Sequence, residues 1–91
     1  MIKTGTRVLI RTNSAGVHFG TLISRESQEV HLSHARRLWS WSGALSLSEI
    51  AAAGCDIKNS KISVAVDEIL LTQAIEIIPI NSKSNLNSLW N

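Results

Sequence analysis

Two arginines and two tryptophans lie within eight residues of this 91-residue chain, in the segment His34-Ala35-Arg36-Arg37-Leu38-Trp39-Ser40-Trp41. A guanidinium is attracted to the face of an indole ring, and this combination recurs where proteins hold anions, nucleic-acid bases or protein partners. Tryptophans in a small domain also serve as core residues. The segment therefore predicts a binding site and leaves the class of ligand open.

Eight residues in and after this segment are the candidate ligand contacts. We expect Arg36 and Arg37 to hold phosphate groups, and Trp39 or Trp41 to stack on a base. Gly43 permits close approach of the backbone, and the N–H groups at the start of a helix attract anions. The full set of predicted ligand-binding residues is His34, Arg36, Arg37, Trp39, Trp41, Ser42, Gly43 and Ser46.

The chain is poorly equipped for catalysis. It has no phosphate-binding loop, no zinc-ligand spacing, no nucleophile elbow and no tyrosine. His31 and His34 are three residues apart, so on a strand they point to opposite faces and do not form a metal pair. Cys55 is the only cysteine and cannot form an internal disulfide. We expect a non-enzymatic protein with no catalytic residues, no metal and no cofactor.

Positive charge is concentrated in the first half of the chain. Residues 1–41 carry six Lys or Arg residues and two Glu, whereas residues 42–91 carry three Lys and five Asp or Glu. Five of the six cations in the first half are arginines, which suit two-point contact with phosphate or carboxylate. A net charge of +2 is small for tracking a polymer, so a compact anion is favoured over RNA or DNA.

No segment has the features of a membrane or secretory element. The apolar runs 69–71 and 77–80 are too short to cross a bilayer, and residues 1–5 have no apolar signal core. We therefore expect a soluble protein without a membrane partner, in a reducing compartment.

Alternation of apolar and polar residues predicts a β-hairpin at the start of the chain. The strands are expected over Thr6–Thr12 and Val17–Ser24, with turn-forming residues at 13–16 between them. Gly20 interrupts the second strand, which predicts a bulge or a sharp bend.

A third strand is expected from Glu29 and is expected to run on toward Trp41. On such a strand Trp39 and Trp41 share one face, because they are two residues apart. Ser46 and Glu49 have the spacing of a capping box, which predicts a short helix over residues 46–53. This helix is too short to be stable alone and must dock on the sheet.

The remaining elements complete a small β domain. Residues 62–66 predict a fourth strand, residues 66–72 fit either a strand or a helical turn, and residues 74–80 predict a closing strand. We expect one domain over residues 1–80, mainly β, with the architecture of a small SH3-like or Sm-like β-barrel and an inserted helix near residues 46–53. Residues 81–91, rich in Asn and Ser, are expected to form a loose C-terminal tail, whose Leu86, Leu89 and Trp90 are available to dock on a neighbour.

Several motifs of the chain resemble those of a known protein family. The motifs are residues 14–22, 35–44, 47–49, 66–72 and 75–79, and the resemblance covers roughly residues 5 to 80. The family consists of small proteins of unknown function carried mainly by tailed bacteriophages and prophages. The resemblance implies a phage setting, in which small proteins often inhibit host defence by binding a defence enzyme or a nucleotide signal.

We therefore expect a phage protein, in the host cell cytoplasm, that counteracts antiviral defence by sequestering a small anionic nucleotide-like signal. Two alternatives stay open, a protein-binding inhibitor of a host defence enzyme that uses the same Arg/Trp surface, and an Sm-like RNA- or DNA-binding protein. Because residues 74–80 form an expected edge strand, the sequence also predicts a homo-oligomer.

Overall fold

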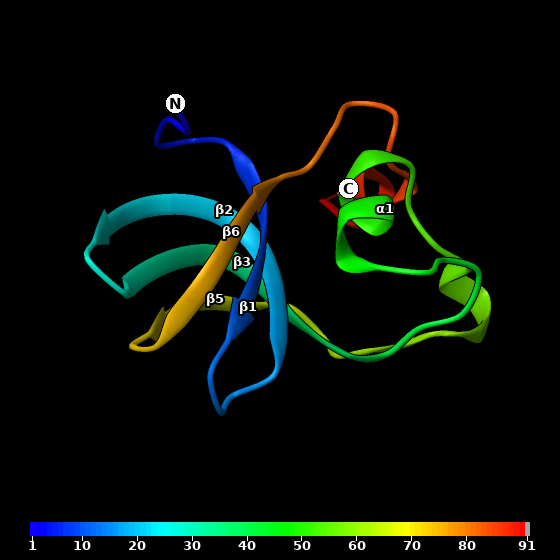
Figure 1. Cartoon of the computed structure of the whole chain (residues 1–91), viewed down its shortest axis with the longest axis horizontal. Coiled ribbons are helices and arrows are strands. Elements are labelled where there is room, and N and C mark those ends of the chain that lie inside the picture. The colour runs from blue at the N-terminus through cyan, green and yellow to red at the C-terminus, as the bar shows by residue number, and fades with distance from the viewer. Residues whose placement is uncertain (91) are drawn as a thin grey trace.

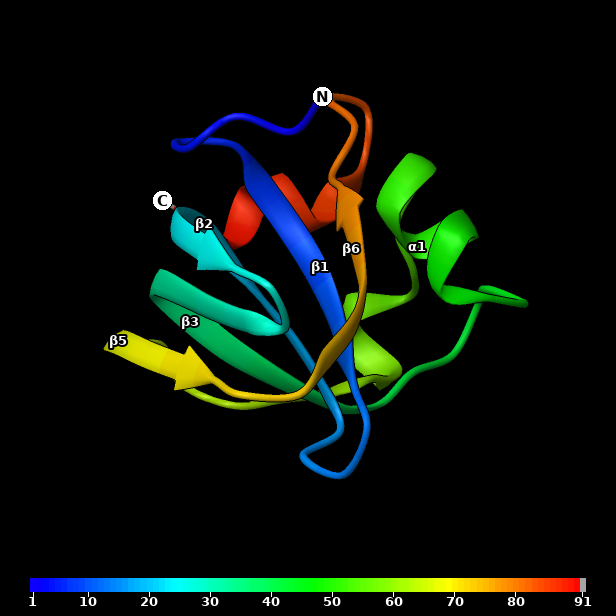
Figure 2. The ribbon, with the colours of Figure 1, turned by 60° about the vertical axis from the view of Figure 1, so that its left-hand side comes forward.

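Six antiparallel strands, one short α-helix and two 3-10 helices make up the computed structural model, which describes residues 1–90 (Figures 1 and 2). The strands are β1 (Arg7–Thr12), β2 (Val17–Glu26), β3 (Glu29–Ser40), β4 (Lys61–Ile62), β5 (Val66–Leu71) and β6 (Ala74–Pro79). The helices are α1 (Leu47–Ala52), η1 (Ile57–Asn59) and η2 (Asn85–Trp90). The prediction of a mainly β fold with one short α-helix is confirmed.

The strands form one sheet in the order β4-β3-β2-β1-β6, and β5 pairs with another part of β3. The predicted closed barrel is wrong, because within residues 1–90 no ladder joins β5 to β6. At the start of β6, the backbone N–H of Ala74 donates to the carbonyl oxygen of Gln28 in the β2–β3 turn (3.0 Å). The sheet is therefore open, and β6 has a partner strand on one side only.

The predicted hairpin of β1 and β2 is confirmed. Arg7 lies opposite Thr21 and Arg11 opposite Val17 in an antiparallel register. The Thr12 hydroxyl stabilises the turn, since it accepts a hydrogen bond from the Ala15 N–H (2.8 Å) and donates one to the Gly16 carbonyl (2.7 Å).

The predicted irregularity at Gly20 is also confirmed. The register of β2 against β3 shifts between Phe19 and Thr21, where β3 carries one extra residue. A Cβ at Gly20 would lie 2.8 Å from the carbonyl oxygen of Ser33, so only glycine lets the two backbones approach this closely. Opposite Gly20, His34 has a positive φ of 48°, which marks the bulge in β3.

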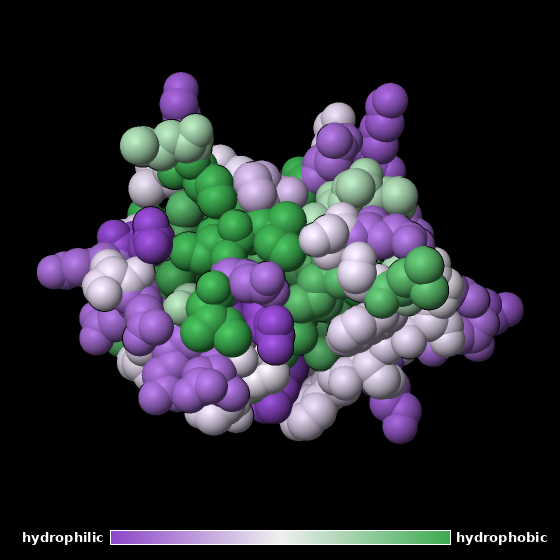
Figure 3. Space-filling model, in the orientation of Figure 1, coloured by the Kyte–Doolittle hydropathy of each residue, from purple (hydrophilic) through white to green (hydrophobic). Residues whose placement is uncertain are grey.

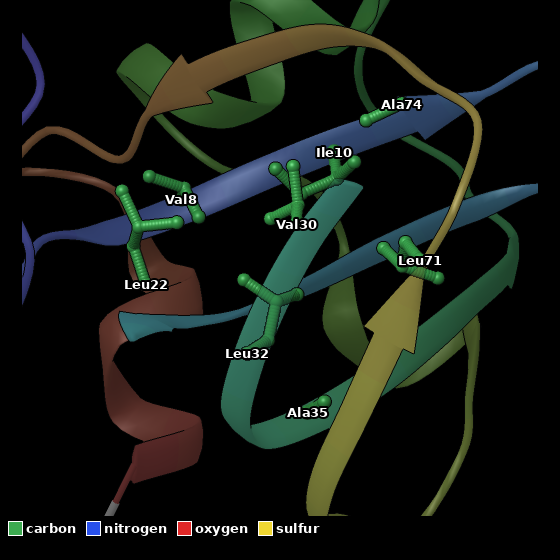
Figure 4. Packing of buried hydrophobic residues seen from close by; sticks show 8 residues of the cluster. All are labelled: Val8, Ile10, Leu22, Val30, Leu32, Ala35, Leu71 and Ala74. Atoms are coloured by element: carbon green, nitrogen blue, oxygen red, sulfur yellow. The ribbon is translucent and has the colours of Figure 1, made fainter. Parts of the chain in front are cut away.

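Apolar side chains cover both faces of the sheet, because β1 has hydrophobic residues at consecutive positions. Val8 and Ile10 point to one face and Leu9 to the other. The first core lies inside the curled strands (Figure 4) and contains Val8, Ile10, Leu22, Val30, Leu32, Ala35, Leu71 and Ala74. The second core lies on the opposite face, under the helices, and contains Leu9, Phe19, Leu38, Ile50, Ala51, Cys55 and Leu86.

The helix α1 begins as the capping pattern predicts. The Ser46 hydroxyl oxygen accepts a hydrogen bond from the backbone N–H of Glu49 (3.2 Å). Ile50 is fully buried in the second core and docks the helix on the sheet. The chain leaves the helix at Gly54, whose φ is 102° and whose missing side chain makes room for Asn85.

The predicted fourth strand over residues 62–66 is interrupted. The strand β4 has only two residues, and β5 begins at Val66 after a break. At the break, the Ser63 hydroxyl oxygen accepts a hydrogen bond from the backbone N–H of Arg37 (2.7 Å), and the Ser63 N–H donates to the Arg37 carbonyl oxygen (2.9 Å). Residues 66–71 are strand, which settles the alternative that the sequence left open.

Residues 81–90 pack against the sheet, so the predicted loose tail is wrong for this segment. Leu86 is fully buried, and Leu89 and Trp90 pack against the same second core. The Trp90 Nε1–H donates a hydrogen bond to the hydroxyl of Thr21 (2.8 Å). Leu86, Leu89 and Trp90, the apolar residues that the sequence singled out in this segment, thus dock on the second core of the chain itself. Residue 91 of the predicted tail lies outside the described residues.

Candidate functional site

Arg37 and Trp39 form a stacked pair at the end of β3, which we name the Arg37–Trp39 shelf. The two residues are two apart on a strand, so their side chains share one face. The Arg37 Cζ lies 3.9 Å from the centroid of the Trp39 ring, which is a cation–π distance. Trp39 is 61% exposed, so the pair is open to solvent.

The β1–β2 turn contacts the Arg37 guanidinium on a second side. A Cβ at Gly16 would lie 3.0 Å from Nη2 and 3.2 Å from Nε of Arg37. Gly16 also has a φ of 82°, a conformation that favours glycine. The guanidinium is therefore held between the Gly16 backbone and the Trp39 indole.

Arg37 differs from the other arginines because its guanidinium has no hydrogen-bond or ion-pair partner within residues 1–90. The side chain of each other arginine has a partner. Arg11 forms an ion pair with Glu76, and the other three donate hydrogen bonds: Arg7 to Asn87, Arg25 to Ser27, and Arg36 to Ser63 and Leu89. The N–H groups of Arg37 are thus positioned and still free to bind an acceptor from a ligand.

His18 lies beside the shelf and is buried. Its Nε2 is 2.9 Å from the carbonyl oxygen of Ala15, which only accepts, so Nε2 carries the proton. Burial lowers the pKa of His18 below 6.5, the charge of Arg37 lowers it further, and the bond to Ala15 opposes this. The imidazole is therefore neutral at pH 7 and does not add to the positive charge of the shelf.

Trp39 separates two hollows of the surface. One has a volume of about 280 Å³ and is lined by His18, Ala35, Arg36, Arg37, Trp39, Ser63, Val66 and Ile69. The other has a volume of about 520 Å³, is more open, and is lined by Trp39, Ser40 and Lys61. Lys61 is exposed and has no ion-pair partner among the described residues. The indole therefore stands between two cations that have no acidic neighbour bound to them.

Arg36 and His34, which the sequence placed with Arg37 as ligand contacts, are bound instead to backbone carbonyls of the chain. The Arg36 guanidinium donates to the carbonyl oxygens of Ser63 (3.0 Å) and Leu89 (3.3 Å). The His34 Nε2–H donates to the same Leu89 carbonyl (3.0 Å). Both residues therefore hold the C-terminal segment on the sheet, and the Nε of Arg36 is buried without a partner.

Trp41 does not share a face with Trp39, contrary to the prediction. The strand β3 ends at Ser40, and Trp41 turns to pack at the margin of the second core. It lines a separate hollow of about 400 Å³ together with Arg11 and Glu76. These two charges pair with each other (3.6 Å), so this hollow contains no free cation from Arg11.

The three remaining predicted residues have local structural contacts. The Ser42 carbonyl accepts a hydrogen bond from the N–H of Asp56 (2.8 Å). A Cβ at Gly43 would lie 3.1 Å from the same nitrogen, so the close approach at Gly43 is to the chain itself. Ser46 caps α1. Of the eight predicted residues, the structure stacks Arg37 and Trp39 at an open surface. Arg36 lines the same hollow with its guanidinium already bound, and the other five residues do not line it.

Gly16, His18 and Lys61 belong to this surface and were not among the predicted site residues. The hairpin register offered a signal for His18, because His18 lies directly opposite Arg37 on the neighbouring strand. Gly16 precedes that strand by one residue. Lys61 pairs with Ser40 across two strands separated by some twenty residues, a contact that alternation patterns do not reveal.

A further hollow, apolar in character, lies between the N-terminal segment and β6. Figure 3 shows hydrophobic surface gathered in this region. The hollow has a volume of about 520 Å³ and is lined by Met1, Ile2, Thr4, Leu22, Arg25, Ala74, Ile75 and Ile77. It adjoins the strand β6, which lacks a second partner strand.

Two classes of feature do not occur in the described part of the chain. No helix of residues 1–90 has the length and hydrophobicity needed to cross a membrane. Over the same residues, no three His, Cys, Asp or Glu side chains are grouped in a way that would hold a metal ion.

His31, which the sequence analysis weighed as a metal ligand, contacts a carboxylate instead. Its Nε2 lies 2.7 Å from Oε1 of Glu68, and the two form an ion pair when His31 is protonated.

Comparison with known proteins assigns the chain to a family. The family model described as Domain of unknown function (DUF6948) matches residues 5–87, so the chain belongs to this family. No curated protein and no solved structure matches the chain. The family description carries no activity, and a functional proposal has to be argued from the site itself.

Proposed function

We propose that this member of the DUF6948 family is a non-enzymatic protein that captures a small anionic, nucleotide-like ligand on the Arg37–Trp39 shelf. One observation carries the proposal: the Arg37 guanidinium is held against an exposed indole and has no acceptor within residues 1–90. An anion can therefore bind Arg37 without breaking an existing contact.

A ligand with both a planar ring and a negative charge gains the most from this shelf. Stacking of a base on an aromatic side chain contributes about 1–3 kcal/mol. A hydrogen bond that involves a charged group contributes about 1.5–3 kcal/mol. A nucleotide uses both contributions, whereas inorganic phosphate or a free nucleoside uses one.

The surroundings of the shelf favour a compact ligand over a nucleic acid strand. Trp39 is largely exposed, whereas Trp41 and Trp90 pack on the second core. A strand needs several stacking and phosphate contacts in succession, and the net charge is only +2. Sm-like binding of RNA or DNA is therefore the less favoured proposal.

The biological role that we propose follows from the resemblance to phage proteins. In that setting, removal of a nucleotide-like signal from the host cytoplasm would counteract antiviral defence. This role rests on analogy with a class of small phage proteins, and the binding chemistry stands without it.

A second candidate function is binding to a host defence protein through the same surface. Val64 and Val66 are exposed, and Val66 lines a hollow together with Arg37 and Trp39. Exposed apolar residues around a Trp and an Arg are typical of a protein-binding hot spot. This combination favours an inhibitor as the alternative.

We also propose that copies of the chain associate. The strand β6 lacks a partner on one side, and the adjacent apolar hollow would be covered in an oligomer.

We further propose that the fold is an opened form of an SH3-like or Sm-like barrel. The strand order β6-β1-β2-β3-β5 supports this relationship.

Titration calorimetry with a panel of cyclic nucleotides and nicotinamide-derived nucleotides tests the proposed function. We expect wild-type protein to bind a member of the panel with micromolar or tighter affinity, and the variants Arg37→Ala and Trp39→Ala to lose about tenfold or more. Arg25→Ala is the matched control, because Arg25 is an exposed arginine that lines neither hollow of the shelf.

The same measurements separate the alternatives. A failure to bind any nucleotide, together with a defined host protein that binds wild type and not Trp39→Ala, would favour the inhibitor. Affinity for oligonucleotides that falls steeply with salt would favour the nucleic-acid binder. Equal binding of a nucleotide by wild type and Arg37→Ala would contradict the proposed site.

A further inference from the structure

We infer that the ligand carries two separated anionic groups, one held by Arg37 and one by Lys61, with its ring stacked on Trp39 between them. The ligand class is then a nucleoside bisphosphate or a dinucleotide, and a nucleotide with a single phosphate is a weaker partner. This inference rests on the proposed function and specifies its ligand.

The first step is the choice of indole face. Arg37 already covers one face of Trp39, with its Cζ 3.9 Å from the ring centroid. A base that stacked on this face would have to displace a guanidinium that Gly16 holds in place. The base is therefore expected on the other face.

The second step is the charge in the hollow beside Trp39 that Arg37 does not line, where we place the free face of the indole. The hollow that does not include Arg37 is lined by Trp39, Ser40 and Lys61. Lys61 lies opposite Ser40 across the β3–β4 pair, and it is exposed with no carboxylate partner among residues 1–90. A phosphate attached to the stacked nucleoside can reach this ammonium, which acts as a point charge.

The third step is the unused cation. The guanidinium of Arg37 stays unpaired on the far side of the indole, in the hollow that also contains His18. Arg36 also lines this hollow, but its guanidinium already binds the Ser63 and Leu89 carbonyls. His18 has a lowered pKa and is neutral at pH 7, so Arg37 supplies the cation of this hollow that is free for a ligand. A single phosphate pairs with only one of the two cations, whereas a second phosphate that reaches around the indole edge allows Arg37 and Lys61 to be paired together.

A factorial binding experiment tests this arrangement. The probes are adenosine, adenosine 5′-monophosphate and adenosine 3′,5′-bisphosphate. They are titrated into wild type, Lys61→Ala, Arg37→Ala and the double variant, and binding is followed by tryptophan fluorescence and calorimetry. Lys58→Ala is the control, because Lys58 is an exposed lysine of η1 that lines neither hollow.

We expect each added phosphate to tighten binding to wild type about tenfold, the lower range for a hydrogen bond that involves a charged group. Each single variant should lose one of the two steps, and the double variant should bind the three probes alike. Thermal unfolding of every variant should match wild type, because both side chains are outside the cores.

The outcomes also separate this inference from the proposed function. Equal affinity of the bisphosphate and the monophosphate would overturn the two-anion arrangement, and so would an unchanged phosphate dependence in Lys61→Ala. In either case, loss of binding in Arg37→Ala would still support ligand capture on the Arg37–Trp39 shelf. Absence of binding of all three probes to wild type would count against both.

Discussion

Two adjacent arginines have different roles here because a strand sends successive side chains to opposite faces. Arg36 is turned toward the C-terminal segment and donates to two backbone carbonyls. Arg37 is turned toward the β1–β2 turn and stacks on Trp39. The first stabilises the fold, and the second is free for a ligand.

This division predicts opposite effects of the two alanine substitutions. Arg36→Ala removes the donors of the Ser63 and Leu89 carbonyls and should lower the free energy of unfolding by about 1–3 kcal/mol. Arg37→Ala should change it by less than about 1 kcal/mol, because Arg37 is half-buried and loses only its cation–π contact with Trp39. Urea denaturation followed by circular dichroism measures both values, and equal losses would contradict the assignment.

The glycine beneath Arg37 offers a second prediction. Gly16→Ala places a Cβ 3.0 Å from Nη2 of Arg37, so the guanidinium must move by a few tenths of an ångström, which should alter its stacking on Trp39 and the Trp39 fluorescence. Gly5→Ala is the matched control, because Gly5 has a similar φ of 89° and open space around it. Both variants should lose about 1–2 kcal/mol to backbone strain. A fluorescence change of the same size in both would show that strain alone is responsible.

The buried imidazole of His18 makes stability depend on pH. Its pKa is lowered in the folded state by burial and by Arg37, so the unfolded state takes up a proton first as pH falls. This contribution to stability is complete above pH 6.5, the ordinary value, and is lost as pH falls from there to the lowered pKa.

His18→Gln should flatten this part of the pH profile, because glutamine can keep the N–H bond to Ala15 and does not titrate. Urea midpoints between pH 7.5 and about pH 5 measure the effect against His31→Gln, which leaves His18 in place. An unchanged slope in His18→Gln would mean that other groups cause the dependence.

At the scale of elements, the C-terminal 3-10 helix η2 is part of the second core. Leu86→Ala should therefore lower the free energy of unfolding by about 2–5 kcal/mol, the usual cost of truncating a buried leucine. Ser88→Ala, an exposed change in the same helix, should cost little. A small effect of Leu86→Ala in urea denaturation would contradict this packing.

The elements that the sequence predicted correctly are those with local signals. Alternation revealed β1 and β2, Gly20 marked the bulge, and Ser46 with Glu49 marked the start of α1. The errors concern contacts between distant residues. The packing of Leu86 depends on the sheet face that it meets, and composition alone predicted a loose segment.

The candidate site also combines local relations, which the sequence could predict, with contacts between distant residues, which it could not. The pairing of Arg37 with Trp39 could be predicted, because a spacing of two on a strand is a local relation. The separation of Trp41 from Trp39 could not, since it depends on where β3 ends. Lys61 joins the shelf only through the β3–β4 pair, which brings it beside Ser40.

At the scale of the whole molecule, the open sheet leaves β6 available for association. Ile75 is 47% exposed at this strand and lines the apolar hollow. Ile75→Lys should weaken self-association about tenfold or more, because the lysine charge would be desolvated in the interface. Light scattering over a concentration series measures the effect, with Val64→Lys as an exposed control on a different segment. A monomeric wild type at all concentrations would refute association through β6.

The hydrogen bonds around Leu89 link two distant parts of the surface. Its carbonyl binds His34 and Arg36, Arg36 also binds the Ser63 carbonyl, and the Ser63 hydroxyl binds the amide of Arg37. Release of the C-terminal segment would thus loosen the backbone that carries the shelf. A partner that bound the C-terminal segment and displaced it from the sheet would therefore weaken the proposed ligand site. Such a partner would be an allosteric effector, because it would bind at a different site from the ligand.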